Sequence, residues 1–136
     1  MRFVDSNVFL RFLTRDDEGK AQACHEMFQR LDRGEEEAAT NELIVAELTY
    51  VLSSRSHYNL THDEIRARLV PMLNLRGLRL SRKRLCFRAL DLYVTFPTLD
   101  FEDAFAVASM EDGEVAEIYS YDRDFDALPT LRRIEP

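Results

Sequence analysis

Short apolar segments alternate with longer amphipathic segments along this chain, and the alternation predicts an α/β fold. The short segments have the length of buried strands, whereas the longer ones repeat apolar residues at helical spacing. Helical connections of this kind favour parallel strands, so we expect a three-layer α/β/α sandwich around a central, mainly parallel sheet. The length of 136 residues, 46% of them hydrophobic, fits a single domain over residues 1–136.

The secondary structure of the first half of the chain is predicted from the periodicity of its apolar residues. Residues 2–4 form a short run with the character of a buried strand, and Val8, Phe9, Phe12 and Leu13 then follow helical spacing. The same periodicity predicts helices over residues 17–33 and 41–55, with a strand over residues 37–40 between them.

The secondary structure of the second half is predicted from helix-capping residues as well as from the periodicity of apolar residues. Thr61 and Glu64 form a capping-box pattern, which opens a helix that ends near residue 74 and is followed by Gly77. Asp100 is suited to cap a helix that continues to Gly113. The other expected elements are strands at residues 78–80, 117–121 and 131–134, and a helix at residues 82–95.

The composition limits where the protein acts. No apolar run approaches the roughly 18 residues of a membrane span, and an acid at position 5 interrupts any signal sequence, so we expect a cytoplasmic protein. Cys24 and Cys86 are expected to stay free, and the histidines lack zinc-ligand spacing.

The net charge of −7 alone argues against a nucleic-acid partner. Divalent cations bound to acidic side chains would offset part of that charge. The basic residues are nearly all arginine, which suits bidentate contacts with phosphate, although a biased genome composition would give the same excess.

Acids that follow apolar runs are the first candidates for chemistry. Asp5 follows the first expected strand, and Asp122 and Asp124 follow the apolar residues 118–121. Binding sites in open α/β sheets lie outside the carboxyl ends of the strands, where these acids are expected. Simpler roles are also open, because Asp5 could cap a helix and Asp122 could belong to a turn. In an extended segment Asp122 and Asp124 would point to the same side.

Two further candidate acids lie within expected helices. Glu47 shares a helical face with Leu43 and Val51, and an acid in an apolar stripe requires compensation, unless it lies at the edge of the stripe or pairs with an arginine. Asp103 lies in a first helical turn, where it could instead serve as a capping partner. Glu42 is left out of the site, because its place in a first turn is explained by the helix dipole.

Four segments that contain these acids resemble the motifs of PIN-domain ribonucleases. They are Phe-Val-Asp-Ser-Asn-Val-Phe-Leu at 3–10, Val-Ala-Glu-Leu-Thr-Tyr-Val-Leu at 45–52, Asp-Phe-Glu-Asp-Ala-Phe-Ala-Val-Ala at 100–108 and Tyr-Ser-Tyr-Asp-Arg-Asp-Phe at 119–125. The segments span nearly the whole chain, and its length is similar to that of stand-alone bacterial and archaeal PIN domains. Most of those domains are VapC-type toxins of toxin–antitoxin pairs.

The resemblance implies an endoribonuclease that depends on Mg²⁺ or Mn²⁺, since converging carboxylates suit hard divalent cations. The implied catalytic acids are Asp5, Glu47, Asp103 and Asp122, and the implied metal ligands are Asp5, Asp103, Asp122 and Asp124. The supporting polar residues would be Asn7 and Ser120, and the candidates for phosphate contact are Arg11, Arg15, Arg55 and Arg123. Tyr121 and the acidic net charge depart from the expected pattern.

The resemblance also implies partners: an RNA substrate, a cognate antitoxin and a second copy of the chain in a homodimer. Phe9, Phe12 and Leu13 could line a groove for the antitoxin, or they could be core residues.

Three alternatives remain open at this stage. The first is a PIN-like nuclease that processes RNA without a toxin role. The second is an aspartate-based phosphohydrolase, but Asn7 stands where its second acid is expected and lysine is nearly absent. The third is a binding module with a decayed site, against which the intact set of acids argues.

Overall fold

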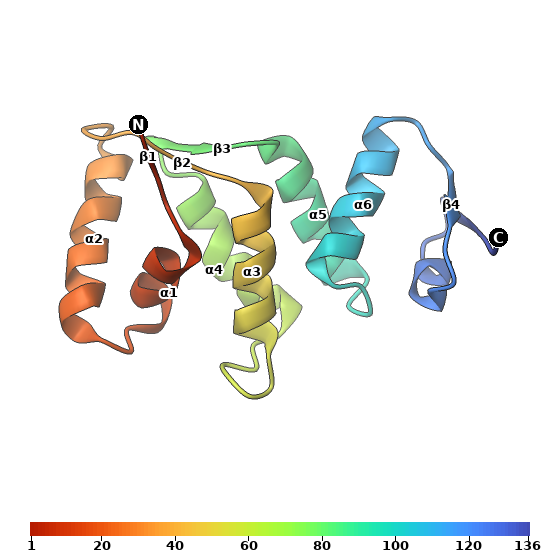
Figure 1. The fold of residues 1–136 in the computed structure, drawn as a ribbon, viewed down its shortest axis with the longest axis horizontal. Coiled ribbons are helices and arrows are strands. Elements are labelled where there is room, and N and C mark those ends of the chain that lie inside the picture. The colour runs from red at the N-terminus through yellow and green to blue at the C-terminus, as the bar shows by residue number, and fades with distance from the viewer. The chain divides into compact units, whose positions relative to one another are not determined.

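The protein consists of two compact units, Met1–Lys83 and Arg84–Pro136, in a computed structural model that describes residues 1–136. Figure 1 shows the helices and strands of both units along the chain. Every strand pair is parallel, which confirms the predicted α/β class with parallel strands. No helix has the length and apolar character needed to cross a membrane.

The N-terminal unit is built on three parallel strands in the order β1-β2-β3. Arg2 pairs with Ala38, which in turn pairs with Leu78. The strands are β1 (Arg2–Phe3), β2 (Ala38–Thr40) and β3 (Leu78–Leu80), and the helices are α1 (Ser6–Thr14), α2 (Glu18–Asp32), α3 (Glu42–Ser53) and α4 (His62–Leu73). Because β1 and β2 lead almost directly into α1 and α3, the first turns of these helices lie near the carboxyl ends of the strands (Figure 1).

The core of this unit comes from the apolar faces of its helices. Phe9 of α1 is fully buried, and its ring centroid lies 5.3 Å from that of Phe28 in α2. Phe9 is therefore a core residue, whereas Phe12 and Leu13 are only half-buried. Leu31, Leu48, Leu69 and Leu73 complete the packed interior.

Gly77 precedes β3 at a close approach between backbone segments. A Cβ atom at this position would lie 2.1 Å from the carbonyl oxygen of Glu36 and 2.8 Å from that of Leu31. Its amide donates to the Leu31 carbonyl oxygen at 2.8 Å, so any larger residue would displace β3 from the end of α2.

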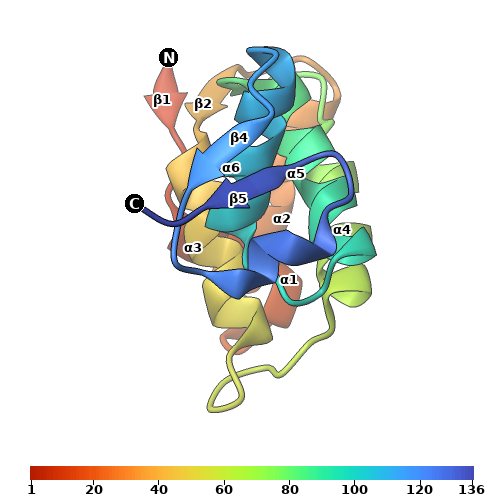
Figure 2. The ribbon, with the colours of Figure 1, turned by 90° about the vertical axis from the view of Figure 1, so that its right-hand side faces the viewer.

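The C-terminal unit contains two helices and a two-stranded parallel sheet. The elements are α5 (Lys83–Thr95), which begins at the unit boundary, α6 (Phe101–Asp112), β4 (Glu117–Tyr119), the 3₁₀ helix η1 (Arg123–Ala127) and β5 (Arg132–Ile134). Glu117 pairs with Arg132, and Figure 2 shows β4 and β5 side by side. Leu90, Tyr93, Ala104 and Phe125 are among the buried residues of this unit.

One local expectation is wrong, and the structure decides between two alternatives at another place. Residues 2–4 were expected to form a buried strand, but Arg2 and Phe3 are exposed because β1 lies at the edge of its sheet. For Asp122 and Asp124 a turn and an extended segment were both open, and the chain turns there into η1, whose N-cap is Asp122. The amide of Asp124 donates to the Asp122 carboxylate at 2.9 Å, and this local bond favours a helical turn over an extended strand.

Candidate functional site

Asp5 lies at the carboxyl end of β1, at the N-cap position of α1. Its backbone is extended, with φ −80° and ψ 160°, but its side chain makes no capping hydrogen bond. Only its carbonyl oxygen is used locally, as the acceptor for the amide of Val8 at 3.1 Å. The exposed carboxylate therefore stays available to a ligand, and Asn7 is exposed in the first turn of the same helix.

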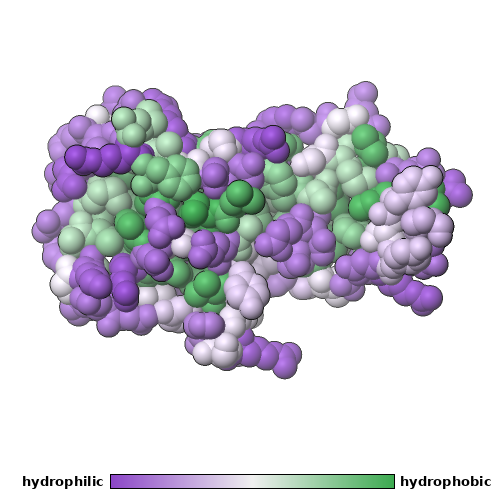
Figure 3. Space-filling view, viewed as in Figure 1, coloured by the Kyte–Doolittle hydropathy of each residue, from purple (hydrophilic) through white to green (hydrophobic).

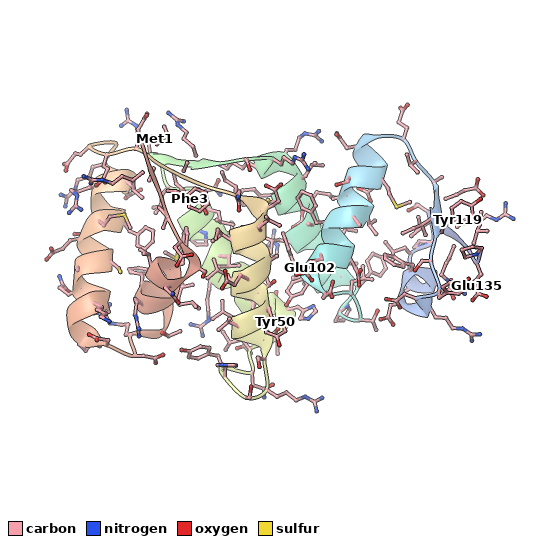
Figure 4. All side chains as sticks on the ribbon, in the orientation of Figure 1. Met1, Phe3, Tyr50, Glu102, Tyr119 and Glu135 are labelled. Atoms are coloured by element: carbon pink, nitrogen blue, oxygen red, sulfur yellow. The ribbon has the colours of Figure 1, made fainter.

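Glu47 is exposed on α3 and forms no ion pair with an arginine. The expectation that its face is buried is wrong, because Leu43 on that face is 71% exposed. The buried face of α3 instead carries Val45, Leu48 and Leu52. Apolar residues lie on more than one face of α3, so the spacing by four residues predicted the wrong face to be buried. Figure 3 shows apolar residues exposed where β1 and α3 lie, and Figure 4 labels Tyr50 on α3.

Glu42, also on α3, is held by neighbouring groups. Its carboxylate accepts a hydrogen bond of 2.8 Å from Ser81 Oγ and lies 3.8 Å from the guanidinium of Arg82. Hydrogen bonding to its own backbone amide and to Ser81, together with the Arg82 charge, lowers the pKa of Glu42. These contacts support its exclusion from the site.

Asp103 lies in the first turn of α6 among other acids. Its amide donates to the Asp100 carboxylate at 2.8 Å, which confirms Asp100 as the N-cap of the helix. Burial raises the pKa of Asp103 to about 6, and the charge of Asp100, hydrogen bonding with Asp100, and the charges of Asp122 and Glu102 act in the same direction. A proton or a cation would relieve this repulsion.

Asp122 is positioned by short-range hydrogen bonds at the end of β4. Its amide donates to Ser120 Oγ at 3.0 Å, so Ser120 supports this acid as the sequence suggested. Its carboxylate accepts from the amide of Asp124, whose own side chain is exposed. The structure thus brings Asp103, Asp122 and Asp124 together within the C-terminal unit, and places Asp5 and Glu47 in the N-terminal unit.

Sequence reasoning missed part of this acidic group. Asp100 was expected only as a cap, and Glu102 was expected to point to solvent outside the site; Glu102 is indeed exposed. Burial and the Asp100 charge raise the pKa of Glu102, and Figure 4 shows Glu102 at the N-terminal end of α6. The signal in the sequence was the close spacing of three acids over residues 100–103.

The four candidate phosphate-binding arginines differ in their availability. Arg15 forms an ion pair with Glu18, with Nη2 and Oε2 3.1 Å apart. Arg11, Arg55 and Arg123 form no ion pair, and the side chains of Arg55 and Arg123 are exposed. Arg55 and Arg123 are therefore the freest of the four.

A metal site is not formed by the residues as placed here, since no group of three His, Cys, Asp or Glu side chains is arranged to hold a metal ion. The assignment of Asp5, Asp103, Asp122 and Asp124 as metal ligands stays a prediction.

An apolar cavity of about 220 Å³ lies within the N-terminal unit. Phe12 lines it, with its ring stacked on His25 at a centroid distance of 5.6 Å and edge-on to Phe28 at 5.4 Å. Pro71, Met72 and Leu75 line it from α4 and the residues after it, and Asp32 adds a carboxylate.

Two solved structures resemble the chain at low identity. VapC20 of Mycobacterium tuberculosis, described as a toxin that cleaves the sarcin–ricin loop, is 20% identical, with 93% of this chain and 94% of that chain covered and a TM-score of 0.35. VapBC2 of Rickettsia felis, bound to a promoter DNA fragment, is 12% identical, with 98% and 97% covered and a TM-score of 0.36. With TM-scores this low, neither likeness supports an inference about the present chain.

No curated protein matches the sequence significantly. The family model described as PIN domain matches residues 2–131, which include all five candidate acids and most of each unit. The chain therefore belongs to the PIN-domain family.

Proposed function

We propose that this protein is a metal-dependent endoribonuclease that hydrolyses RNA phosphodiester bonds. One observation carries the proposal: none of the acids Asp5, Glu47, Asp103, Asp122 and Asp124 forms an ion pair. Other acids close to them in sequence do, because Glu42 lies near Arg82 and Asp126 binds Arg133. Carboxylates left without a cation within the chain are free to bind one from outside.

The donor set fits Mg²⁺ or Mn²⁺, because these cations prefer carboxylate oxygens and retain several waters. The raised pKa of Asp103 supports this fit, since a bound cation would favour its ionised form. Asp5, Asp103, Asp122 and Asp124 are the proposed ligands. When bound, the metal would lower the pKa of a coordinated water and stabilise the leaving oxygen of the phosphodiester.

The remaining residues would orient the reactants and move a proton. Glu47, unpaired and exposed, is proposed to accept a proton from the attacking water. Ser120 Oγ accepts a hydrogen bond from the backbone amide of Asp122, and Asn7 offers a side-chain amide two residues after Asp5. Arg55 and Arg123 are the proposed phosphate contacts, with Arg11 as a further candidate, because the planar guanidinium suits phosphate oxygens. Arg15 would first have to leave Glu18.

The test is cleavage of a mixed tRNA and rRNA pool by wild type, Asp5→Asn and a matched acid variant, Glu42→Gln, each with Mg²⁺, Mn²⁺ or EDTA. We expect metal-dependent cleavage by wild type and Glu42→Gln, and none by Asp5→Asn. Equal cleavage by Asp5→Asn would remove Asp5 from the mechanism. Release of phosphate from a small phosphomonoester without RNA cleavage would indicate an aspartate-based phosphohydrolase.

We also propose that the nuclease is the toxin of a toxin–antitoxin pair and forms a homodimer. The support is the arrangement of the four motifs over nearly the whole length of the chain. The cavity lined by Phe12, Phe28 and Met72 offers an apolar groove that suits one face of an antitoxin helix. Expression of the chain alone, and together with any short reading frame that precedes its gene, tests this role: growth arrest relieved by such a frame supports it, and normal growth favours an RNA-processing nuclease.

A further inference from the structure

Arg133 is the most enclosed ion-pairing arginine of the C-terminal unit, with a side chain only 13% exposed. It lies on β5, and its neighbour Arg132 points to solvent with a side chain 78% exposed. Enclosed arginines are uncommon unless their donors are satisfied, so the partners of Arg133 show what it holds.

The guanidinium of Arg133 joins the two sides of the segment that presents Asp122 and Asp124. On one side, Nη1 donates to the carbonyl oxygen of Ser120 at 3.0 Å. On the other side, Nε and Nη2 donate to the two carboxylate oxygens of Asp126 at 2.9 and 3.3 Å. Nη1 also donates to Glu135 at 2.9 Å. Figure 4 labels Tyr119, the last residue of β4, and Glu135, which follows β5.

The bonds inside the segment continue this connection to the acids. Ser120 Oγ accepts from the amide of Asp122, and the Asp122 carboxylate accepts from the amide of Asp124. The amide of Ser120 donates to the carbonyl oxygen of Ile134 at 3.1 Å, which fixes the same end to β5. Phe125, buried between Asp124 and Asp126, anchors the middle of the turn. Residues 120–126 are thus closed into a loop whose ends Arg133 ties together.

We propose that Arg133 is a positioning residue, which holds Asp122 and Asp124 in the orientation that metal binding requires without touching the metal. The inference rests on the proposed nuclease function. The bidentate bond to Asp126 fixes the far end of the turn, and the bond to the Ser120 carbonyl fixes the near end. Residues that orient ligands in this way typically contribute about 10- to 100-fold to metal affinity or activity.

The chain offers a matched control for this role. Arg132 is the preceding residue on the same strand, and its guanidinium pairs with Glu117 at 3.3 Å, outside residues 120–126. Arg132→Gln removes the same charge and one ion pair from β5. It leaves every bond of the 120–126 loop intact, so it reports the effect of losing one charge and one exposed ion pair from β5.

The experiment compares wild type, Arg133→Gln, Arg133→Lys and Arg132→Gln at a temperature where circular dichroism shows all four to be folded. Mn²⁺ affinity is measured from the electron paramagnetic resonance signal of free Mn²⁺. We expect Arg133→Gln to weaken Mn²⁺ binding by about 10-fold or more, Arg133→Lys to recover part of that loss, and Arg132→Gln to match wild type. Equal Mn²⁺ affinity in Arg133→Gln and wild type would overturn the proposal.

Amide hydrogen exchange of residues 120–126 in the metal-free proteins gives a readout that does not depend on the nuclease function. Faster exchange in Arg133→Gln than in Arg132→Gln supports the role of Arg133 in ordering this segment, and unchanged exchange contradicts it. If wild type binds no Mn²⁺ at all, the proposed function fails. The exchange comparison then still decides whether Arg133 orders the turn.

Discussion

The two units carry their candidate acids in different electrostatic surroundings. In the N-terminal unit, Asp5 and Glu47 lie on different helices, and both are exposed without an ion-pair partner. In the C-terminal unit, Asp103 shares the start of α6 with Asp100 and Glu102 and is also affected by the Asp122 charge. Asp5, Asp103 and Asp122 all lie at the end of a strand or helix, whereas Glu47 lies within α3, and only the C-terminal unit crowds like charges together.

This difference indicates a division of roles among acids that the sequence alone makes look equivalent. Crowded carboxylates are stabilised most by a cation, since each added positive charge relieves several repulsions at once. Isolated exposed carboxylates are better suited to single contacts, such as accepting one proton or binding one ligand position. We therefore expect the C-terminal acids to contribute more to the proposed metal affinity than the N-terminal ones.

The largest expected effect follows from replacing the most crowded acid. Asp103→Asn should reduce RNA cleavage on the order of 1,000-fold, because loss of a metal ligand removes several kcal/mol of transition-state stabilisation. Steady-state cleavage rates at saturating Mg²⁺ provide the measurement. Asp112→Asn, at the other end of α6 and paired with Arg84, is the control and should retain wild-type rates. Comparable rates for both variants would show that crowding at Asp103 has no part in the reaction.

The N-terminal unit allows a comparison on a single helix. Glu47→Gln should lower the cleavage rate about 100-fold with little change in stability, since removal of a general base affects only the chemistry. Glu42→Gln should show the opposite result. It weakens the contacts with Ser81 and Arg82, and so should cost about 1 kcal/mol of unfolding free energy while cleavage persists. Urea unfolding and cleavage assays measure both quantities for each variant. Normal cleavage by Glu47→Gln, or lost cleavage by Glu42→Gln, would contradict the prediction.

Most of the fold was predictable because its signals are local. The capping residues Thr61 and Asp100 accept hydrogen bonds from Glu64 and Asp103 as their spacing indicates. The expected helices appear within a few residues of their predicted ends. Helix periodicity and caps are read within one or two turns, so no long-range information is needed.

Predictions that required a direction in space were less successful. Leu43, Glu47 and Val51 do share a face of α3, but nothing in their spacing tells which of two apolar faces is buried. The sequence left a turn and an extended segment both open at Asp122 and Asp124, and the bond from the Asp124 amide to the Asp122 carboxylate belongs to the turn, η1. The support that Arg133 gives to Ser120 and Asp126 depends on the pairing of β4 with β5, which no local pattern specifies.

A smaller effect concerns the stability of the metal-free protein. The folded-state pKa of Asp103, about 6, lies above its ordinary value of 3.8, so folding favours the protonated carboxyl. Stability contributed by that proton is fully present below the unfolded pKa and is lost as pH rises through the folded pKa, from about pH 4 to about pH 6. Asp103→Asn, which cannot ionise, should therefore be more stable than wild type at pH 7 by on the order of 1 kcal/mol, after allowance for solvent screening.

Thermal unfolding in EDTA between pH 4 and pH 7 measures this difference. The stability gained from Asp103→Asn should shrink toward pH 4, and Asp112→Asn should show no such trend. Added Mn²⁺ should raise the melting temperature of wild type more than that of Asp103→Asn, because the cation stabilises the ionised form. A constant difference across the pH range would mean that Asp103 ionisation is not the cause.

The smallest expected effect separates the contributions of burial and of like charge at Asp103. Asparagine caps a helix about as well as aspartate, so Asp100→Asn should keep the hydrogen bond from the Asp103 amide while removing one negative charge. The pKa of Asp103 should then fall, but only part of the way to its ordinary value, because burial is its largest cause and is unchanged. Titration of the Asp103 carboxyl carbon by NMR in the metal-free protein measures this shift, with Asp112→Asn as the matched charge control. A pKa that stays near 6 would show that the Asp100 charge does not contribute, and would leave burial together with the Asp122 and Glu102 charges as the causes.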